Sequence, residues 1–131
     1  MILQVRHAMK GHPFTIPYDA SVTETARTMI TAGIETIVVT KNNDILGSVT
    51  TNDILRYTYT PGFNPAKTSI ETITNEDIML ARPRTSLDDI RNIMTESNVN
   101  TLPVVDKKLV GYITLRDLVK VQPEKLEAQV L

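Results

Sequence analysis

The chain of 131 residues contains no cysteine and no tryptophan, and it has only two histidines, His7 and His12. Without cysteine, neither a disulfide framework nor a thiolate zinc site can form. Two histidines are too few for a histidine-rich metal site, although carboxylates could still hold a hard cation. We therefore assign no metal site.

Long apolar runs and an excess of one charge are also missing. No run approaches the roughly 20 residues of a membrane span, and the first residues lack the apolar core and small-residue cleavage site of a signal peptide. The 14 basic and 15 acidic residues give a net charge of -1, which argues against a broad basic surface for nucleic acid. We expect a cytoplasmic protein that binds neither membranes nor nucleic acid.

The sequence contains an internal repeat. Residues Ser21–Val39 match Ser86–Val104 at an offset of 65, and Gly47–Asp53 match Gly111–Asp117 at an offset of 64. The identical pairs in the first match include Ser21 and Ser86, Met29 and Met94, Thr36 and Thr101, and Val39 and Val104. Because the identities keep the same order and local pattern, the chain is predicted to fold as two similar units.

Each repeat begins with a predicted helix. Ser21 is a helix N-cap, Glu24 completes a capping box, and Gly33 can end the helix in a left-handed conformation. The second copy repeats these signals at Ser86, Asp89 and Asn98. Apolar residues at helical spacing lie between them, and we interpret the methionines among these as core residues.

A hairpin and a second helix follow. The strand Ile37–Val39, a turn at Lys41–Asp44, the strand Ile45–Thr50 and a helix Asp53–Tyr59 are predicted in the first copy. The second copy gives Leu102–Val105, a turn at Asp106–Lys108, Leu109–Thr114 and a helix from Leu115. Extended segments at residues 14–16 and 79–81 precede the repeats, so the fold class is α/β in the wider sense, namely α+β.

These patterns define the expected domain organisation. The first repeat covers residues 1–59, a linker with Pro61 and Gly62 covers 60–69, and the second repeat covers 70–122. Residues 123–131 form a tail that could be an amphipathic helix with Leu126 and Val130 on one side, packed on the module or at a dimer interface. Since each half buries too little surface alone, the repeats are expected to form one compact module.

The second repeat carries a family resemblance. Leu102–Asp106 followed by Leu109–Leu118 resembles the CBS domain family, and the first repeat is similar but has Val38 in place of a usual proline and Ser48 in place of an apolar residue. The resemblance extends from about Val5 to about Leu118, so we expect a stand-alone tandem CBS pair, or Bateman module.

The resemblance implies a function as well as a fold. Two repeats pack through their sheets with pseudo-twofold symmetry and bind an adenosine-containing ligand in the cleft between them. The ligands of this family include AMP, ADP, ATP and S-adenosylmethionine. Such modules commonly form dimers and regulate another protein, so we expect a homodimer with an unidentified regulated partner, no cofactor and no catalytic activity.

The Thr-x-x-Asp motif, at Thr50 and Asp53 and again at Thr114 and Asp117, has two interpretations. It can be a helix cap. It can also place a threonine hydroxyl and helix N–H groups near a phosphate and a carboxylate near ribose hydroxyls, with the preceding glycine leaving room beside the cleft. By the resemblance, Thr50 and Thr114 contact phosphate, and Asp53 and Asp117 bind ribose. The second motif, which keeps the family pattern, is expected to be the stronger site.

The remaining ligand contacts are less sharply indicated. The resemblance nominates Phe14, Met79 and Tyr112 for the base pocket, where ordinary core or rim packing is an equal alternative. Candidate phosphate cations are Arg56, Arg116 and Lys120, although such residues are more often solvated surface residues than ligand contacts. Because Glu35 would repel a phosphate, a monophosphate, a nucleoside or S-adenosylmethionine suits the charge better than a triphosphate.

Two other functions compete with ligand sensing. Catalysis would need a positioned nucleophile and base, and the adjacent acids Asp88 and Asp89 are explained by their place in the first turn of a helix. The alternative that stays open is a ligand-free dimeric scaffold for protein interactions.

Overall fold

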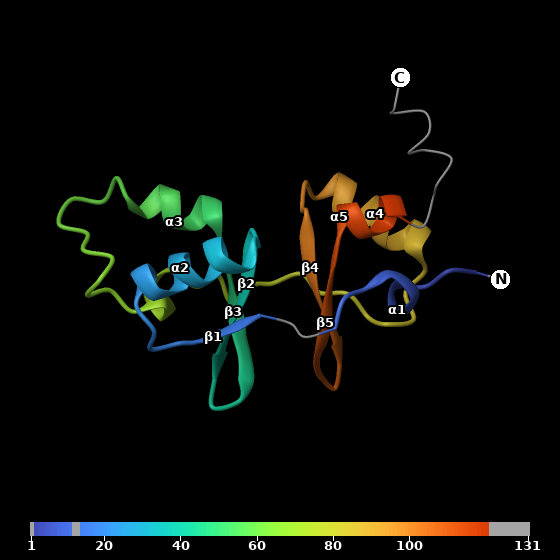
Figure 1. The fold of residues 1–131 in the computed structure, drawn as a ribbon, viewed down its shortest axis with the longest axis horizontal. Helices are drawn as coiled ribbons and strands as arrows, with labels where there is room; N and C mark the ends of the chain where they lie inside the picture. The colour runs from blue at the N-terminus through green and yellow to red at the C-terminus, as the bar shows by residue number, and fades with distance from the viewer. Residues whose placement is uncertain (1, 12–13, 121–131) are drawn as a thin grey trace, which may run out of the picture. The chain divides into compact units, whose positions relative to one another are not determined.

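The computed structural model describes residues 2–11 and 14–120 (Figure 1). The chain separates into two compact units. One unit is Phe14–Ile78, which we call the central unit, and the other combines Met1–Pro13 with Met79–Leu131, which we call the terminal unit. Each unit is described by itself below.

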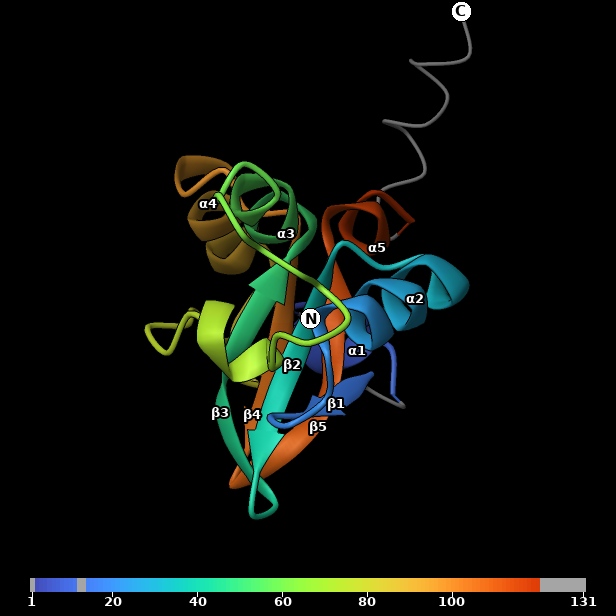
Figure 2. The same ribbon diagram turned by 90° about the vertical axis from the view of Figure 1, so that its left-hand side faces the viewer.

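The central unit contains the predicted helix, hairpin and second helix in that order. Its elements are β1 (Thr15–Pro17), α2 (Val22–Ala32), β2 (Thr36–Lys41), β3 (Asp44–Thr50), α3 (Thr51–Tyr57) and the 3₁₀ helix η1 (Ile70–Ile73). Strand β2 pairs in parallel with β1 and antiparallel with β3, which Figure 2 shows from the side of this unit. Asn42 and Asn43 take positive φ angles of 54° and 69°, so they form the tight turn between β2 and β3.

The terminal unit repeats this arrangement. Its elements are α1 (Val5–Ala8), α4 (Leu87–Glu96), β4 (Thr101–Asp106), β5 (Lys108–Thr114) and α5 (Leu115–Lys120). Strands β4 and β5 are antiparallel, and Ala81 makes a parallel bridge to Val104. Ala81 therefore takes the place beside β4 that β1 takes beside β2, and the α+β prediction is confirmed for both repeats.

The predicted starts and ends of the two helices are also confirmed, but of the capping box expected at Ser21 and Glu24 the structure has only the half in which Ser21 accepts from the Glu24 amide. The Oγ of Ser21 accepts a hydrogen bond from Glu24 N at 3.0 Å, and the Oγ of Ser86 accepts one from Asp89 N at 3.1 Å. Gly33 ends α2 with φ 68°, and Asn98 follows α4 with φ 54°. A helix N-cap contributes about 1 kcal/mol, so these residues help to set where each helix begins.

The hydrophobic cores are built from corresponding residues of the two repeats. Buried pairs from the first helix and the hairpin are Val22 and Leu87, Met29 and Met94, Ile37 and Leu102, Val39 and Val104, and Val49 and Ile113. Burying each aliphatic side chain contributes about 1.5–3 kcal/mol. The predicted role of the methionines as core residues is confirmed.

The segments ahead of the repeats are exchanged between the two units. Val5 of α1 is buried in the core of the terminal unit, whereas Ile70 and Ile73 of η1 are buried in the core of the central unit. Val5 and Ile70 are equivalent at the repeat offset of 65. Each core therefore uses a short helix that the sequence numbering assigns to the other repeat, and the units divide the chain differently from the predicted repeats 1–59 and 70–122.

The predicted linker 60–69 is part of the central unit. The ring of Phe63 lies 6.3 Å from the ring of Tyr57, centroid to centroid. The backbone carbonyls of Pro65 and Thr68 accept hydrogen bonds from Thr23 N at 3.1 Å and Val22 N at 2.9 Å. The linker is thereby fixed against the start of α2.

Candidate functional site

The first Thr-x-x-Asp motif joins β3 to α3 as a complete capping box. The Oγ1 of Thr50 accepts a hydrogen bond from Asp53 N at 3.1 Å, and Asp53 Oδ2 accepts one from Thr50 N at 2.9 Å. The next amide, Thr51 N, donates to the carbonyl of Glu35 at 3.0 Å. Most of the donors at the start of α3 therefore have protein partners.

The second motif, between β5 and α5, has the same bonds and one more. Asp117 N donates to Thr114 Oγ1 at 3.2 Å, and Thr114 N donates to Asp117 Oδ2 at 2.9 Å. The hydroxyl of Thr114 also donates to Asp117 Oδ2, at 2.9 Å. Leu115 N donates to the carbonyl of Asn100 at 3.1 Å, as Thr51 does to Glu35. Capping, the simpler of the two interpretations, is thus realised in both repeats.

The two carboxylates differ in exposure and in their nearby cation. The side chain of Asp53 is 22% exposed, and its Oδ1 lies 3.8 Å from the guanidinium of Arg56, which is itself 75% exposed. Asp117 is only 2% exposed, and its Oδ1 lies 3.6 Å from Lys10 Nζ. A buried carboxylate needs a partner for its charge, and Lys10 supplies it. Asp53 is therefore the more accessible acceptor.

Lys10 is held beside β5 by its backbone. Lys10 N donates to Tyr112 O and Tyr112 N donates to Lys10 O, both at 2.9 Å. In the central unit, Asn75 and Ser48 exchange the same two hydrogen bonds, at 2.9 and 3.0 Å. Asn75 is thus the structural counterpart of Lys10.

A second difference in charge follows from the helix sequences. Arg116 in the first turn of α5 corresponds to Asn52 in the first turn of α3. Both Arg116 and Asn52 are exposed. The site of the terminal unit therefore has two cationic side chains, Lys10 and Arg116, where the central unit has two asparagines.

The glycine of each motif is required by a close backbone approach. A β-carbon on Gly111 would collide with the carbonyl oxygen of Lys10, and one on Gly47 would collide with the carbonyl oxygen of Asn75. The space beside these glycines is thus taken by the exchanged segments, which differs from the expectation that it leaves room for a ligand.

The predicted base-pocket residues lie in different units. Phe14, in the central unit, is 41% exposed, and Met79, in the terminal unit, is 42% exposed. Tyr112 is half-buried on β5 of the terminal unit. Phe14 lines a hollow of about 540 Å³ along α2, together with Thr28 and Thr31.

Among the predicted phosphate cations, Arg56 contacts Asp53 and Arg116 is exposed on α5. The side chain of Lys120 and the tail 123–131 lie outside the described part of the chain. The sequence interpretation missed Lys10. No local pattern could have identified it, because its contact with Asp117 depends on the pairing of residues 4–11 with the second repeat.

Residues 2–11 and 14–120 include neither a helix long and apolar enough to cross a bilayer nor a group of three or more histidine, aspartate and glutamate side chains that could hold a metal ion. His7 serves a local structural role, since its Nδ1 accepts a hydrogen bond from Gln4 N at 2.9 Å. His12 lies outside the described residues.

The fold and the two motifs define a class of protein with two α+β repeats, each with a capped Thr-x-x-Asp motif after its hairpin. The family model of the CBS domain matches residues 5–59 and 70–124. The chain therefore belongs to the CBS domain family and contains a CBS pair, which confirms the resemblance seen in the sequence.

Known proteins with similar sequences and folds include three examples. The uncharacterized protein MJ0450 of Methanocaldococcus jannaschii is 29% identical over 116 residues, which cover 86% of this chain and 62% of that protein. An inosine-5'-monophosphate dehydrogenase of Nitrosopumilus maritimus is 27% identical over 125 residues, covering 89% of this chain and 24% of the dehydrogenase. The chain thus spans less than two thirds of either relative.

The third example is a solved structure. The CBS domain pair of protein MJ0100, crystallised in complex with 5'-methylthioadenosine and S-adenosyl-L-methionine, superposes with a TM-score of 0.82 at 23% identity. The match covers 95% of this chain and 99% of that one. At this identity the likeness establishes the shared fold.

Proposed function

We propose that this CBS pair is a regulatory module that binds an adenosine-containing ligand and passes the binding signal to a partner protein. The observation that carries the proposal is the same in both repeats. The cap uses Oδ2 of Asp53 and of Asp117, whereas Oδ1 of each faces, within residues 2–11 and 14–120, only the side chain of a cation. A vicinal diol could take over this second oxygen without breaking the cap. The adenosine derivatives bound by the MJ0100 pair also support this ligand class.

Each motif residue has a proposed role. The Oδ1 atoms of Asp53 and Asp117 accept hydrogen bonds from the ribose hydroxyls of the ligand. Thr50 and Thr114 lie on the phosphate side, where the backbone amide of Asn52 or Arg116, in the first turn of the helix, adds a donor. Phe14, Met79 and Tyr112 are the proposed base contacts, and Arg56 and Lys120 are further proposed cations.

The two motifs are expected to prefer ligands of different charge. Lys10 and Arg116 favour a phosphate at the terminal unit, as in AMP, ADP or ATP. The central unit has Asn75 and Asn52 at these places and Arg56 as its proposed cation, so it should favour a less highly charged ligand, such as adenosine or S-adenosylmethionine. The hydroxyl proton of Thr114 is already donated to Asp117, so a phosphate in the terminal unit would depend on the cations more than on this hydroxyl.

We further propose that the protein is a cytoplasmic homodimer without catalytic activity of its own. Ile30 on α2 is 81% exposed and Leu55 on α3 is 60% exposed, and covering such apolar side chains favours association. Sedimentation at micromolar concentration is expected to show a dimer. A single species of 14.6 kDa would contradict this part of the proposal.

Isothermal titration calorimetry with AMP, ADP, ATP and S-adenosylmethionine tests the ligand. Asp53→Ala and Asp117→Ala each remove two proposed hydrogen bonds to ribose, which should cost about 1–3 kcal/mol, or roughly 5- to 150-fold in affinity at that site. Asp89→Ala is the matched control, because Asp89 holds the same position in α4 with Ser86 as its cap. Loss of affinity in the control variant as well would show that the effect comes from folding.

A ligand-free interaction scaffold is the second candidate function. It is favoured by one observation: Asp117 is 2% exposed and already has Thr114 and Lys10 as partners. If no adenosine ligand binds the wild type at millimolar concentration, the scaffold replaces the sensor.

A further inference from the structure

Cationic side chains gather at one end of the terminal unit, near the turn between β4 and β5. Arg6 N donates a hydrogen bond to Pro83 O at 2.8 Å, so Arg6 lies beside the residue that Arg82 and Arg84 flank. The guanidinium of Arg82 donates in turn to Val105 O at 3.2 Å, near the end of β4. Three segments that are far apart in the sequence are thereby held together.

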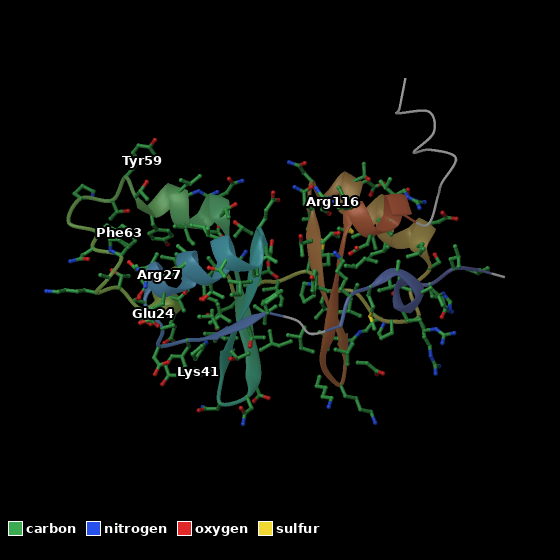
Figure 3. All side chains as sticks on the ribbon, in the orientation of Figure 1. Glu24, Arg27, Lys41, Tyr59, Phe63 and Arg116 are labelled. Carbon is green, nitrogen blue, oxygen red and sulfur yellow. The ribbon has the colours of Figure 1, made fainter. Side chains whose placement is uncertain are left out.

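The turn that follows Val105 adds two lysines. Asp106 and Lys108 are partners in the strand register, and Lys107 between them takes a φ of 64°. Figure 3 shows side chains that end in nitrogen at the tip of this hairpin. The cations of this end are all exposed. We call the following set the basic surface: Arg6, Arg82, Arg84, Lys107 and Lys108.

The cations of the basic surface have no anionic partner in the part of the chain that the structure describes. Within residues 2–11 and 14–120, none of them forms an ion pair. The acids nearest to them in sequence are Asp88, Asp89 and Asp106. Asp88 already pairs with Arg91, at 2.8 Å. Like charges that lie side by side repel one another, and a bound anion offsets this repulsion.

The central unit has an acid where the terminal unit has Arg6. Glu71 is equivalent to Arg6 at the repeat offset of 65. Their backbones make the same contact, since Glu71 N donates to Tyr18 O at 3.1 Å as Arg6 N donates to Pro83 O. Glu71 is paired in its own unit, where the Nζ of Lys41, labelled in Figure 3, lies 3.0 Å from its Oε1. The fold of this end therefore does not require a cation at the position of Arg6.

Two further cations of the basic surface are also replaced by acids. Arg84 is equivalent to Asp19 at the offset of 65, and Lys108 is equivalent to Asp44 at the offset of 64. Both acids are in the central unit. Because the two units share their fold but not this charge, the cations have a purpose other than folding.

The chemistry of the basic surface favours carboxylates on a short segment. A guanidinium binds a carboxylate through two parallel hydrogen bonds, and three of the cations are arginines. Nucleic acid and lipid bilayers are extended polyanions that contact much of a small protein, and the net charge of this chain is -1. An acidic protein segment needs only the basic surface itself.

We propose that the basic surface of the terminal unit binds an acidic segment of the partner protein. The proposal rests on the proposed function for the existence of such a partner. The surface contains no residue of the Thr-x-x-Asp motifs, so the docking does not require the adenosine ligand.

Fluorescence anisotropy with a labelled peptide of alternating glutamate and glycine tests the surface in the full chain. Arg6→Gln with Arg84→Gln should weaken binding of this peptide about 2- to 30-fold, the range for two partly exposed charge pairs. The matched control is Arg27→Gln with Lys67→Gln, which removes the same charge from exposed positions of the central unit and should bind like the wild type. Equal losses in the two double variants would overturn the proposal, as would a wild type that does not bind the peptide at low ionic strength.

A third variant keeps the test independent of any loss of folding. Lys107→Asn removes one charge from the turn, and asparagine tolerates the positive φ of this position, so the hairpin is kept. Its affinity for the peptide should also fall. Unchanged affinity in Lys107→Asn and in the pair Arg6→Gln and Arg84→Gln would contradict the proposal.

The same assay separates the other polyanions. A single-stranded oligonucleotide and vesicles of anionic lipid are compared with the peptide. If either binds more tightly than the peptide and loses affinity in Arg6→Gln with Arg84→Gln, the surface serves nucleic acid or lipid, and the proposal is overturned. Calorimetry with AMP tests the adenosine site separately, so its failure would leave the peptide result decisive for the basic surface.

Discussion

The Nζ of Lys10 lies 3.6 Å from Oδ1 of Asp117, although the two residues are near opposite ends of the chain. The contact exists because the backbone of Lys10 pairs with Tyr112 on β5. In the central unit the same backbone position holds Asn75, which has no charge. The two halves of a repeated fold thus differ in charge at equivalent places, and this difference makes the proposed ligand preferences testable.

Lys10→Asn should weaken AMP binding about two- to fivefold, the range expected for one partly exposed charge pair, while leaving adenosine binding unchanged or stronger. The stronger binding of adenosine would follow from freeing Asp117. Calorimetry with AMP and with adenosine measures how the affinity for each ligand changes. Asn75→Lys is the reciprocal variant and should favour AMP over adenosine at the central unit. An equal loss for AMP and adenosine in Lys10→Asn would show that Lys10 acts on folding.

Gly111→Ala and Gly47→Ala should each destabilise the protein by about 1–3 kcal/mol, because the added methyl group meets the backbone carbonyl of an exchanged segment. Chemical unfolding with urea measures the change. Gly11→Ala is the control, since a β-carbon added there would meet no atom of the described residues within 4 Å apart from its chain neighbours, and it should be neutral or slightly stabilising. Full stability in Gly111→Ala would refute the close approach of Lys10.

Fragments of equal length test the exchange of segments. The fragment 14–78 keeps Ile70 and Ile73 in its core, whereas the fragment 1–65 lacks both of them. We expect fragment 14–78 to show more helical circular dichroism and a clearer thermal transition than fragment 1–65. A stably folded, monomeric fragment 1–65 would contradict both the exchange and the expectation that a half module is unstable.

Much of this fold could be predicted because its signals are local. Ser21 and Ser86 identify the helix starts, and Gly33 and Asn98 identify the helix ends. The two hairpins follow from short β-branched runs around turns, and the core positions follow from the helical spacing of residues such as Met29.

The exchange of segments could not be predicted in this way. Lys10 and Asn75 pair through backbone atoms, which leave no trace in the choice of side chain. The helices α1 and η1 are only four residues long, too short for a clear period. The sequence ranks the motif of Asp117 above that of Asp53 because the second motif keeps the family pattern, whereas the structure shows Asp117 to be the less exposed carboxylate. The roles of both residues in ligand binding stay predictions.

The pair of Lys41 and Glu71 predicts an alkaline dependence of stability. Lys41 Nζ lies 3.0 Å from Glu71 Oε1, and this hydrogen bond, together with the carboxylate charge, raises the pKa of Lys41 above 10.5. Because the folded state binds the proton more tightly, the contribution of the pair is full below pH 10.5 and is lost as the pH rises through the raised pKa.

Lys41→Gln should therefore be less stable than the wild type at neutral pH, and the difference should shrink above pH 10.5. Urea unfolding of both proteins across this range measures it, with the exposed Lys67→Gln as a control that should show no such change. A difference that stays constant with pH would contradict the ion pair.

The central claim, that the module binds an adenosine-containing ligand, is tested most directly by thermal unfolding with AMP, with S-adenosylmethionine and with GMP, the guanine counterpart of AMP. A ligand that binds only the folded state stabilises it by about 2.7 kcal/mol at one hundred times its Kd. We expect AMP or S-adenosylmethionine to raise the melting temperature in a concentration-dependent manner, GMP to leave it unchanged, and the shift to fall in Asp53→Ala or Asp117→Ala. No shift with any adenosine ligand at millimolar concentration would contradict this claim.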